Sequence, residues 1–241
     1  MFSLTHFIHQ FQRVARKAKK RKFRKEIKQL SLKERFSRIY SINYWGHQES
    51  LSGKGSTIEH TENLRAYIPA LVNELAIQSI FDGPCGDLNW MQHVLKDISI
   101  RYVGGDIVPS VIERNIALFS NEITSFIQID LTLDSFPQVD LMICRDCLFH
   151  LSYEDTKKIL NNFVNSNIKY LLTTTYENDG TFENTDIISG HFRLIDLHRA
   201  PYYFPMDVIS KVEDWIYPDN KRYMCLWHRE QIMEAVKKFR E

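Results

Sequence analysis

Two stretches of this sequence combine glycines and carboxylates at a spacing that can bind a small molecule. Asp82-Gly83-Pro84-Cys85-Gly86 follows a short apolar run, and Asp106 ends a second run, Tyr102-Val103-Gly104-Gly105. A glycine turn lets a ligand approach the backbone, and a carboxylate at the end of the next strand accepts hydrogen bonds from both ribose hydroxyls. The pattern therefore predicts a nucleoside site of the Rossmann type.

Acidic residues also follow the later apolar runs. Asp82, Asp106, Asp130 and Asp146 all stand at or just beyond the end of an expected strand. In an open α/β sheet, ligands bind beyond the carboxyl ends of the strands. Acidic groups there repel a pyrophosphate, and Pro84 stiffens the turn that would wrap it, so a nicotinamide-dependent oxidoreductase is disfavoured. A cationic ligand suits the same crevice.

The segment Cys144–His150 carries groups for acid–base chemistry. His150 titrates near neutrality and is the first candidate for a general base, with Asp146 four residues earlier and on the same face if the segment is helical. The alternative for His150 is a capping or packing role under Trp90. Arg145 completes the predicted catalytic set; it either clamps an anionic acceptor or pairs with a strand-end carboxylate.

A framework of alternating strands and helices is expected to position these groups. Apolar runs predict strands at 78–82, 100–106, 124–130, 139–144, 168–175, 212–217 and 221–227. Helical periodicity predicts helices at 59–74, 88–96, 109–119, 153–165 and 228–240. The alternation predicts an α/β fold with a Rossmann-like, seven-stranded, mostly parallel sheet and an antiparallel C-terminal hairpin.

Two irregular segments are expected to cover the ligands. Residues 40–65 are rich in aromatic residues, glycine and serine, and we predict that they form a loop that folds over the bound ligand. Residues 177–205 have no clear periodicity, and a long irregular segment inside a compact domain is more often functional than not. We expect this insertion to lie beside the site for the second reactant, the acceptor.

Composition limits the classes of protein to consider. The chain has 241 residues, 44% of them hydrophobic, which suits one α/β domain. Its four cysteines are too few for a secreted disulfide scaffold and favour the cytoplasm. The Cys144-Arg145-Asp146-Cys147 motif lacks a second pair for zinc, so a redox or metal role is disfavoured. No apolar run approaches the roughly 20 residues of a membrane span, and His6 and His9 interrupt any signal-peptide core.

Positive charge is concentrated in residues 1–40. This segment has 13 Lys and Arg against two acidic residues, whereas the rest has 18 against 28. Apolar spacing predicts a helix over residues 2–28, and we expect 1–40 to form a basic helical extension. The helix either contacts an anionic membrane surface, at the inner face of the membrane, or packs on the domain as a solvated helix. Nucleic acid is an unlikely partner because the remaining chain is net acidic.

The acidic residue and glycine-rich turn of Asp82–Gly86, together with Asp106 and Asp130, resemble the class I S-adenosylmethionine-dependent methyltransferases over roughly residues 40–230. The resemblance departs at Pro84 and Leu88, where glycines are usual. It implies a methyltransferase domain over residues 41–241, with S-adenosylmethionine as methyl donor and S-adenosylhomocysteine as product.

The resemblance also implies roles by position. The turn at Gly83, Cys85 and Gly86 would face the methionyl part of the donor, and Asp82 would orient the turn or the donor's ammonium group. Asp106 would accept from the ribose hydroxyls, and Asp130 from the adenine amino group. Helix capping is the alternative for Asp106 and Asp130. The remaining predicted cofactor contacts are Pro84, Trp90, Ile107, Leu131 and Arg145.

A narrower similarity concerns the acceptor. Tyr44-Trp45-Gly46, residues 52–57, residues 82–91 and residues 144–152 resemble a bacterial subgroup associated with surface polysaccharides, including enzymes that O-methylate capsule phosphoramidates. It implies a glycan or phosphate-bearing acceptor for O-methylation, as a capsular or O-antigen precursor. The predicted acceptor contacts are Asn184, Asp186, Arg193 and Tyr203. No metal ligands are predicted, and divalent-metal dependence stays open.

Alternatives to this reading remain. Residues 144–147 do not match the Pro-Pro-aromatic motif of amino-group methyltransferases, so N-methylation of a nucleic-acid base is disfavoured. An RNA or small-molecule N-methyltransferase and a non-catalytic nucleoside-binding module are the rival functions.

Overall fold

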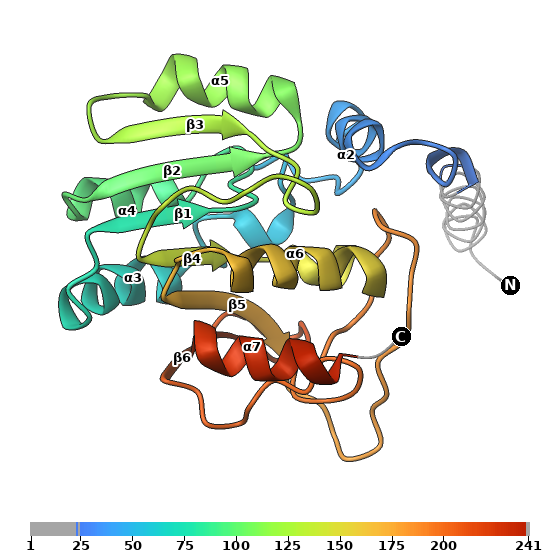
Figure 1. The fold of residues 1–241 in the computed structure, drawn as a ribbon. Coiled ribbons are helices and arrows are strands. Elements are labelled where there is room, and N and C mark those ends of the chain that lie inside the picture. Colours follow the sequence, from blue (N-terminus) through green and yellow to red (C-terminus); the bar gives the residue numbers. More distant parts are fainter. Residues whose placement is uncertain (1–22, 24, 240–241) are drawn as a thin grey trace, which may run out of the picture.

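The computed structural model describes residue 23 and residues 25–239, and its centre is a seven-stranded sheet (Figure 1). The strand order is β3-β2-β1-β4-β5-β7-β6. The strands are β1 (Ser79–Asp82), β2 (Arg101–Asp106), β3 (Thr124–Gln128), β4 (Leu141–Cys144), β5 (Tyr170–Tyr176), β6 (Ser210–Glu213) and β7 (Arg222–His228). Strands β1 to β5 pair in parallel, whereas β7 is antiparallel to both β5 and β6. The predicted fold class is confirmed.

Helices cover both faces of the sheet (Figure 1). They are α3 (Glu62–Glu74), α4 (Met91–Asp97), α5 (Pro109–Phe119), α6 (Tyr153–Asn165) and α7 (Arg229–Lys238). Helix α2 (Leu32–Ser41) lies beyond the carboxyl ends of the strands (Figure 1), and two short 3-10 turns are η1 (Lys54–Ser56) and η2 (Leu148–His150). The central strands β1 and β4 are buried along their whole length, as suits their apolar sequences, whereas the edge strand β3 has exposed residues.

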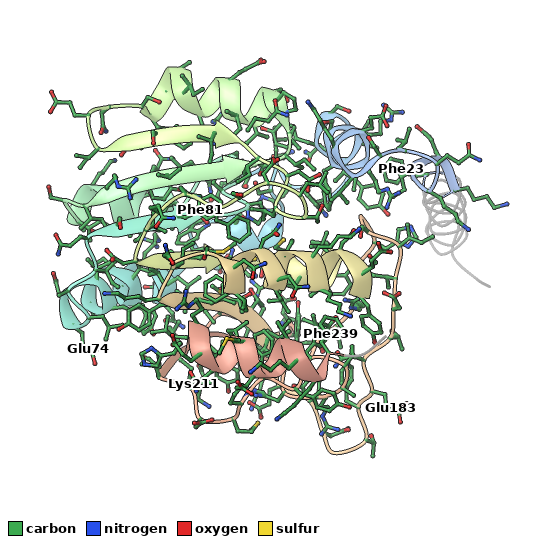
Figure 2. All side chains as sticks on the ribbon, viewed as in Figure 1. Phe23, Glu74, Phe81, Glu183, Lys211 and Phe239 are labelled. Atoms are coloured by element: carbon green, nitrogen blue, oxygen red, sulfur yellow. The ribbon has the colours of Figure 1, made fainter. Side chains whose placement is uncertain are left out.

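Successive strand residues face opposite layers of the core. Ile80 packs with α3 and α4, while its neighbour Phe81 packs with α6 and α7. Figure 2 shows Phe81 inside the molecule and Glu74 and Glu183 pointing away from it. The loops beyond the carboxyl ends of the strands are thereby held on a rigid base.

The structure adds one helix that periodicity did not predict. Ser31 caps α2 in a reciprocal capping box: its hydroxyl accepts from the amide of Glu34, and the Glu34 carboxylate accepts from the Ser31 amide. Helix α2 belongs to the expected 1–40 extension, and its residues Ile39 and Phe36 pack with Phe23 and Ile27. Residues 1–22 and 24, which hold most of the expected basic helix, lie outside the described residues.

Some element boundaries differ from expectation for local reasons. Helix α4 begins at Met91 rather than at 88 because Leu88 has a positive φ of 59°, which a helix does not accept. Strand β3 ends at Gln128, before the turn that contains Asp130, and β6 ends at Glu213, before Asp214 turns inward to an ion pair.

None of the helices in residues 25–239 has the length and apolar character needed to cross a membrane.

Candidate functional site

A cavity of about 340 Å³ lies beyond the carboxyl ends of β1, β2 and β4. Strand ends, the loop before α3 and helix α2 line it together. The predicted site residues that line it are Asp82, Pro84, Cys85, Gly86, Trp90, Asp106, Ile107, Asp130, Leu131, Arg145, Asp146 and His150. Gly83 lies beneath the lining, where a Cβ atom would come within 2.9 Å of Phe81.

The glycine turn is fixed by contacts with its neighbouring strands. The Gly83 amide donates to the Ile143 carbonyl at 2.9 Å, and the Cys85 amide donates to the Gly105 carbonyl at 2.8 Å. Gly86 adopts a positive φ of 55°, a conformation that favours glycine, and its amide donates to Asp106 at 3.2 Å. The turn is thus held in shape by the protein itself.

Asp106 braces the turn and faces the cavity. Besides Gly86, its carboxylate accepts from the Val108 amide at 2.9 Å, and Val108 rather than Asp106 is the N-cap residue of α5. Burial raises the pKa of Asp106 to about 6. No ion pair neutralises it among the described residues. A buried carboxylate with remaining acceptor capacity suits hydroxyl donors.

Asp82 is a second buried carboxylate in the same wall. The Tyr102 hydroxyl donates to its Oδ2 at 2.8 Å, and burial raises its pKa to about 7. Within the described part of the chain it forms no ion pair. The nearby Arg145 guanidinium lowers this pKa without outweighing burial, so a positive ligand group would stabilise the charge further.

Asp130 lies half-buried at the edge of the cavity, in the turn after β3. Its Oδ1 accepts from the amide and hydroxyl of Thr132 at 2.9 and 2.7 Å. This local turn occupies one carboxylate oxygen. The adenine role predicted for Asp130 stays a prediction.

The loop over the cavity is anchored by Asp87, which sequence reasoning did not select. Its carboxylate accepts from the hydroxyls of Ser50 and Ser52 and from the Leu51 amide, at 2.8 to 3.2 Å. Residues 52–56 of this loop line the cavity, as does Trp45. In the sequence, the serines beside the glycines of this loop were the signal that could have indicated its contact with Asp87.

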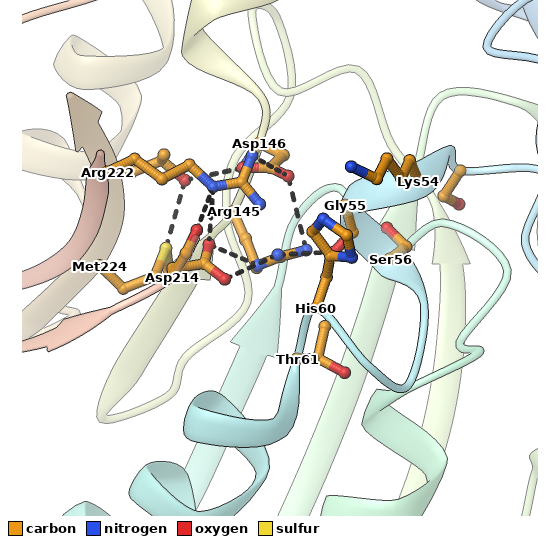
Figure 3. Close-up of polar contacts among 12 residues, drawn as sticks. Lys54, Gly55, Ser56, His60, Thr61, Arg145, Asp146, Asp214, Arg222 and Met224 are labelled. Atoms are coloured by element: carbon orange, nitrogen blue, oxygen red, sulfur yellow. Dashed lines mark hydrogen bonds and ion pairs between the residues drawn. The ribbon is translucent and has the colours of Figure 1, made fainter. Parts of the chain in front are cut away.

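Two arginines and two aspartates form a buried network beside the cavity (Figure 3). Arg145 makes a bidentate pair with Asp214, at 2.8 and 3.0 Å, and donates to the Gly55 carbonyl at 2.7 Å. Arg222 contacts Asp214 and lies 3.1 Å from an oxygen of Asp146. Of the two alternatives for Arg145, the geometry favours pairing with a carboxylate, although that of Asp214 was not anticipated.

Asp146 is held in an unusual backbone conformation by this network. Its φ is 52°, and its amide donates to the Thr174 hydroxyl at 2.9 Å. Burial alone would raise the pKa of Asp146, but the guanidinium groups of Arg145 and Arg222 outweigh burial and keep it below its ordinary value. Asp146 is therefore a carboxylate at neutral pH.

His150 lines the cavity with one ring nitrogen already engaged. Its Nδ1 lies 2.7 Å from the His191 carbonyl, which can only accept, so Nδ1 carries the proton and Nε2 keeps a lone pair. Burial lowers the pKa of His150, which keeps the imidazole neutral. Its ring neighbours are Trp45, Phe149 and Phe192. A neutral histidine with a free lone pair has the form that a general base needs.

The irregular insertion packs against this histidine without bringing its predicted polar residues to the cavity. Asn184 bonds to the backbone of Asp196 and Ala200. Asp186 accepts from the Tyr153 amide, and Arg193 is buried over the Tyr153 ring. Tyr203 is exposed, and none of the four lines the cavity. Their acceptor role stays a prediction.

Several lining residues escaped sequence reasoning. Leu32, Phe36 and Tyr40 reach the cavity from α2, whose start is indicated in the sequence by its capping residues. Tyr176 and Arg222 reach the cavity from β5 and β7. The last two lie far along the chain from the glycine turn, and only strand pairing brings them to it.

The cysteines show no metal or redox arrangement. Cys85, Cys144, Cys147 and Cys225 are all buried and free. Within residues 25–239, no group of three or more His, Cys, Asp or Glu side chains is placed to hold a metal ion.

No model of a protein family matches the sequence, and no curated protein is similar to it. Solved structures do share its fold. Magnesium protoporphyrin IX methyltransferase (ChlM) from Synechocystis PCC 6803 with bound SAH has a TM-score of 0.54 and 13% identity, covering 80% of this chain and 92% of that chain. Human N-acetylserotonin methyltransferase in complex with SAM has a TM-score of 0.50 and 13% identity, covering 70% of this chain and 51% of that one.

A third structure, the S-adenosylmethionine-dependent methyltransferase SibL, has a TM-score of 0.51 and 13% identity, covering 67% of this chain and 53% of that chain. The chain thus spans about half the length of SibL and of the human enzyme. At these identities the likeness concerns the fold, which is that of the class I S-adenosylmethionine-dependent methyltransferases.

Proposed function

We propose that the protein is an S-adenosylmethionine-dependent methyltransferase that transfers a methyl group to an oxygen of its acceptor. The observation that carries this proposal is the pair of buried carboxylates, Asp82 and Asp106, that face one cavity in a methyltransferase fold and form no ion pair among the described residues. A ligand with hydroxyl donors and positive charge compensates for their burial.

The residues present fit the donor. Asp106 would accept from the ribose hydroxyls, and Asp82 with the turn at Cys85 and Gly86 would hold the charged methionyl part. Asp130, at the edge, would contact the adenine. When bound, S-adenosylmethionine supplies an electrophilic methyl group on a sulfonium, whose departure leaves a neutral thioether.

The chain itself would bring the acceptor oxygen into line and remove its proton. Alignment of two bound reactants supplies much of the rate of such a displacement. His150 would take the proton at Nε2 because Nδ1 is committed to the His191 carbonyl. The carboxylate of Asp146 stabilises the imidazolium that forms, since the two groups interact electrostatically. Arg145, through Gly55, would hold the loop that excludes water.

For the acceptor, we propose a glycan or phosphate-bearing precursor of a surface polysaccharide, methylated at a sugar hydroxyl or at a phosphate or phosphoramidate oxygen. The sequence blocks at 44–46, 52–57, 82–91 and 144–152 support this class. The proposal places the reaction in the cytoplasm, where such precursors are built.

Calorimetry tests the donor assignment. The protein should bind S-adenosylhomocysteine and not NAD, and Asp106→Asn should weaken binding by about tenfold or more because one buried acceptor is lost. Asp97→Asn, at the exposed end of α4, is the matched control and should bind normally. Tight binding of NAD, or normal S-adenosylhomocysteine affinity in Asp106→Asn, would contradict the proposal.

A further inference from the structure

A second cavity, of about 280 Å³, adjoins the first and is used by nothing described so far. Lys54, Gly55, Tyr176, Phe192 and Arg222 line both cavities. A ligand in the second cavity therefore lies across a shared wall from the first, which holds Asp146 and His150.

Hydrogen-bond donors dominate this second cavity. Lys54 and His60 both contact the same oxygen of Asp219, at 3.0 and 3.1 Å, so the cavity's acidic side chain is already engaged. Arg222 and Asn220 add further donors. A cavity whose carboxylate is occupied and whose other polar groups donate selects an anionic, oxygen-rich ligand.

Trp215 is an aromatic side chain of the second cavity. Its ring lines the second cavity, and its indole Nε1 is buried without a hydrogen-bond partner among the described residues. A buried indole N–H without a partner costs free energy and is uncommon in folded proteins. Because this Nε1 is inaccessible from the cavity, Trp215 offers a ligand its ring face rather than its N–H.

The remaining walls are flat and aromatic. Trp215, Phe192 and Tyr176 line the cavity, and Phe192 is 51% exposed. An exposed aromatic ring at the mouth of a cavity offers a surface for the apolar face of a sugar ring. Lys54 is also largely exposed, with 58% of its side chain accessible, so it can turn from Asp219 toward an arriving anion.

We propose that this second cavity is the methyl-acceptor subsite and that it binds a phosphorylated sugar, with the phosphate at Lys54 and Asn220 and the sugar ring against the aromatic wall. The ring would extend over the shared wall, so that one hydroxyl reaches His150. This inference rests on the proposed function, which it deepens by naming the acceptor residues. It replaces the insertion residues Asn184, Asp186, Arg193 and Tyr203 as the acceptor contacts we favour.

The test uses the full chain labelled with 5-fluorotryptophan and saturated with S-adenosylhomocysteine, whose own binding is measured first by calorimetry. The fluorine signal of Trp215 is assigned by its loss in Trp215→Phe. Glucose 6-phosphate should shift this signal in a saturable manner and leave that of the fully buried Trp227 unchanged. Glucose and inorganic phosphate, as separate probes, should each bind at least about tenfold more weakly.

Variants assign the contacts. Lys54→Met should weaken glucose 6-phosphate binding by about tenfold, because a charge-assisted hydrogen bond is lost, and S-adenosylhomocysteine is kept saturating because Lys54 also lines the first cavity. Lys96→Met, on exposed α4, is the matched control. Trp215→Phe replaces the indole with a smaller phenyl ring and so reduces the aromatic wall; the affinity of this variant for glucose 6-phosphate, followed by calorimetry, should also fall.

The outcomes separate the two proposals. If S-adenosylhomocysteine binds and glucose 6-phosphate leaves the Trp215 signal unmoved, the acceptor subsite is wrong and the donor site stands. If glucose binds as tightly as glucose 6-phosphate, or if Lys54→Met keeps its affinity for glucose 6-phosphate, the phosphate assignment is wrong. If inorganic phosphate binds as tightly as glucose 6-phosphate, the sugar assignment is wrong. If S-adenosylhomocysteine itself does not bind, the proposed function fails.

Discussion

Asp82 is a buried carboxylate that accepts from the Tyr102 hydroxyl and forms no ion pair among the described residues, and this makes it sensitive to pH. Its folded-state pKa is about 7, above the ordinary value of 3.8. Between these values the folded protein holds a proton that the unfolded chain has lost. The ligand-free protein therefore loses stability as the pH rises from about 4 to 7.

Asp82→Asn removes this dependence, because an amide does not titrate and still accepts from Tyr102. We expect the stability of the variant relative to wild type to increase between pH 5 and pH 8, by about 1 to 4 kcal/mol. Urea unfolding without ligand measures this. Asp106, whose pKa is also raised, contributes equally to both proteins. Parallel pH profiles would show that Asp82 titrates normally.

His150 is expected to be a neutral Nδ1–H tautomer in the resting protein. The His191 carbonyl fixes the proton on Nδ1, and burial lowers the pKa of the ring below its ordinary 6.5. Long-range ¹H–¹⁵N spectra, assigned with His150→Gln, should show an unprotonated Nε2 at pH 7 and a titration midpoint below 6.5. A proton on Nε2 would remove His150 as the base.

At the scale of elements, the loop over the cavity depends on one side chain. Asp87 is buried and binds Ser50, Leu51 and Ser52, so the loop is fixed to the glycine turn beside it. The 3-10 turn η1 then presents the Gly55 carbonyl to Arg145. A Cβ atom at Gly55 would come within 2.7 Å of Asp146, so this close approach needs glycine.

Asp87→Ala should release this loop. Three hydrogen-bonded groups of the loop lose their acceptor, so amide exchange over residues 49–56 should accelerate by about tenfold or more, and S-adenosylhomocysteine affinity should fall. Hydrogen-exchange mass spectrometry and calorimetry measure the two effects. Asp97→Ala serves as control. Unchanged exchange over 49–56 would mean that other contacts hold the loop.

The elements differ in how far sequence could predict them. The strands and α3 to α7 follow from periodicity, because apolar spacing reports burial directly. Helix α2 lies in the 1–40 segment that was expected to be helical, but its start was not predicted. That start is marked by a capping box at Ser31 and Glu34 rather than by a long apolar stripe. Residues of the glycine turn were predicted as site residues, whereas Asp87 beside it was not, nor were Asp214 and Arg222. The pairing of Asp214 and Arg222 with Arg145 and Asp146 depends on the position of β7 in the sheet.

At the scale of the whole molecule, opposite charges are separated along the chain. Residues 1–40 are strongly basic and the remainder is net acidic. Phe23 and Ile27 are buried against Ile39, so the end of the basic segment is tied to α2, which lines the donor cavity. We propose that the residues before Phe23 contact an anionic membrane surface.

Removal of residues 1–22 should abolish sedimentation with vesicles that contain phosphatidylglycerol, and Phe23 and Ile27 remain to support α2. The attraction is electrostatic, so binding of the full chain should weaken steeply with salt. Vesicles of phosphatidylcholine alone are the control. Equal partitioning of the truncated and full chains would exclude this role for the basic segment.

The sequence by itself determined the fold class and predicted the strand-end residues that line the first cavity. Strand periodicity, a glycine turn and carboxylates at strand ends are local features, and parallel strands always bring their carboxyl ends to one edge. The tertiary structure decided which side chains line the second cavity. Lys54, Trp215 and Arg222 come from three separate segments, and they meet only because β7 pairs with β5 and the loop before α3 folds onto Asp87. Contacts between residues so distant along the chain leave no periodic signal in it.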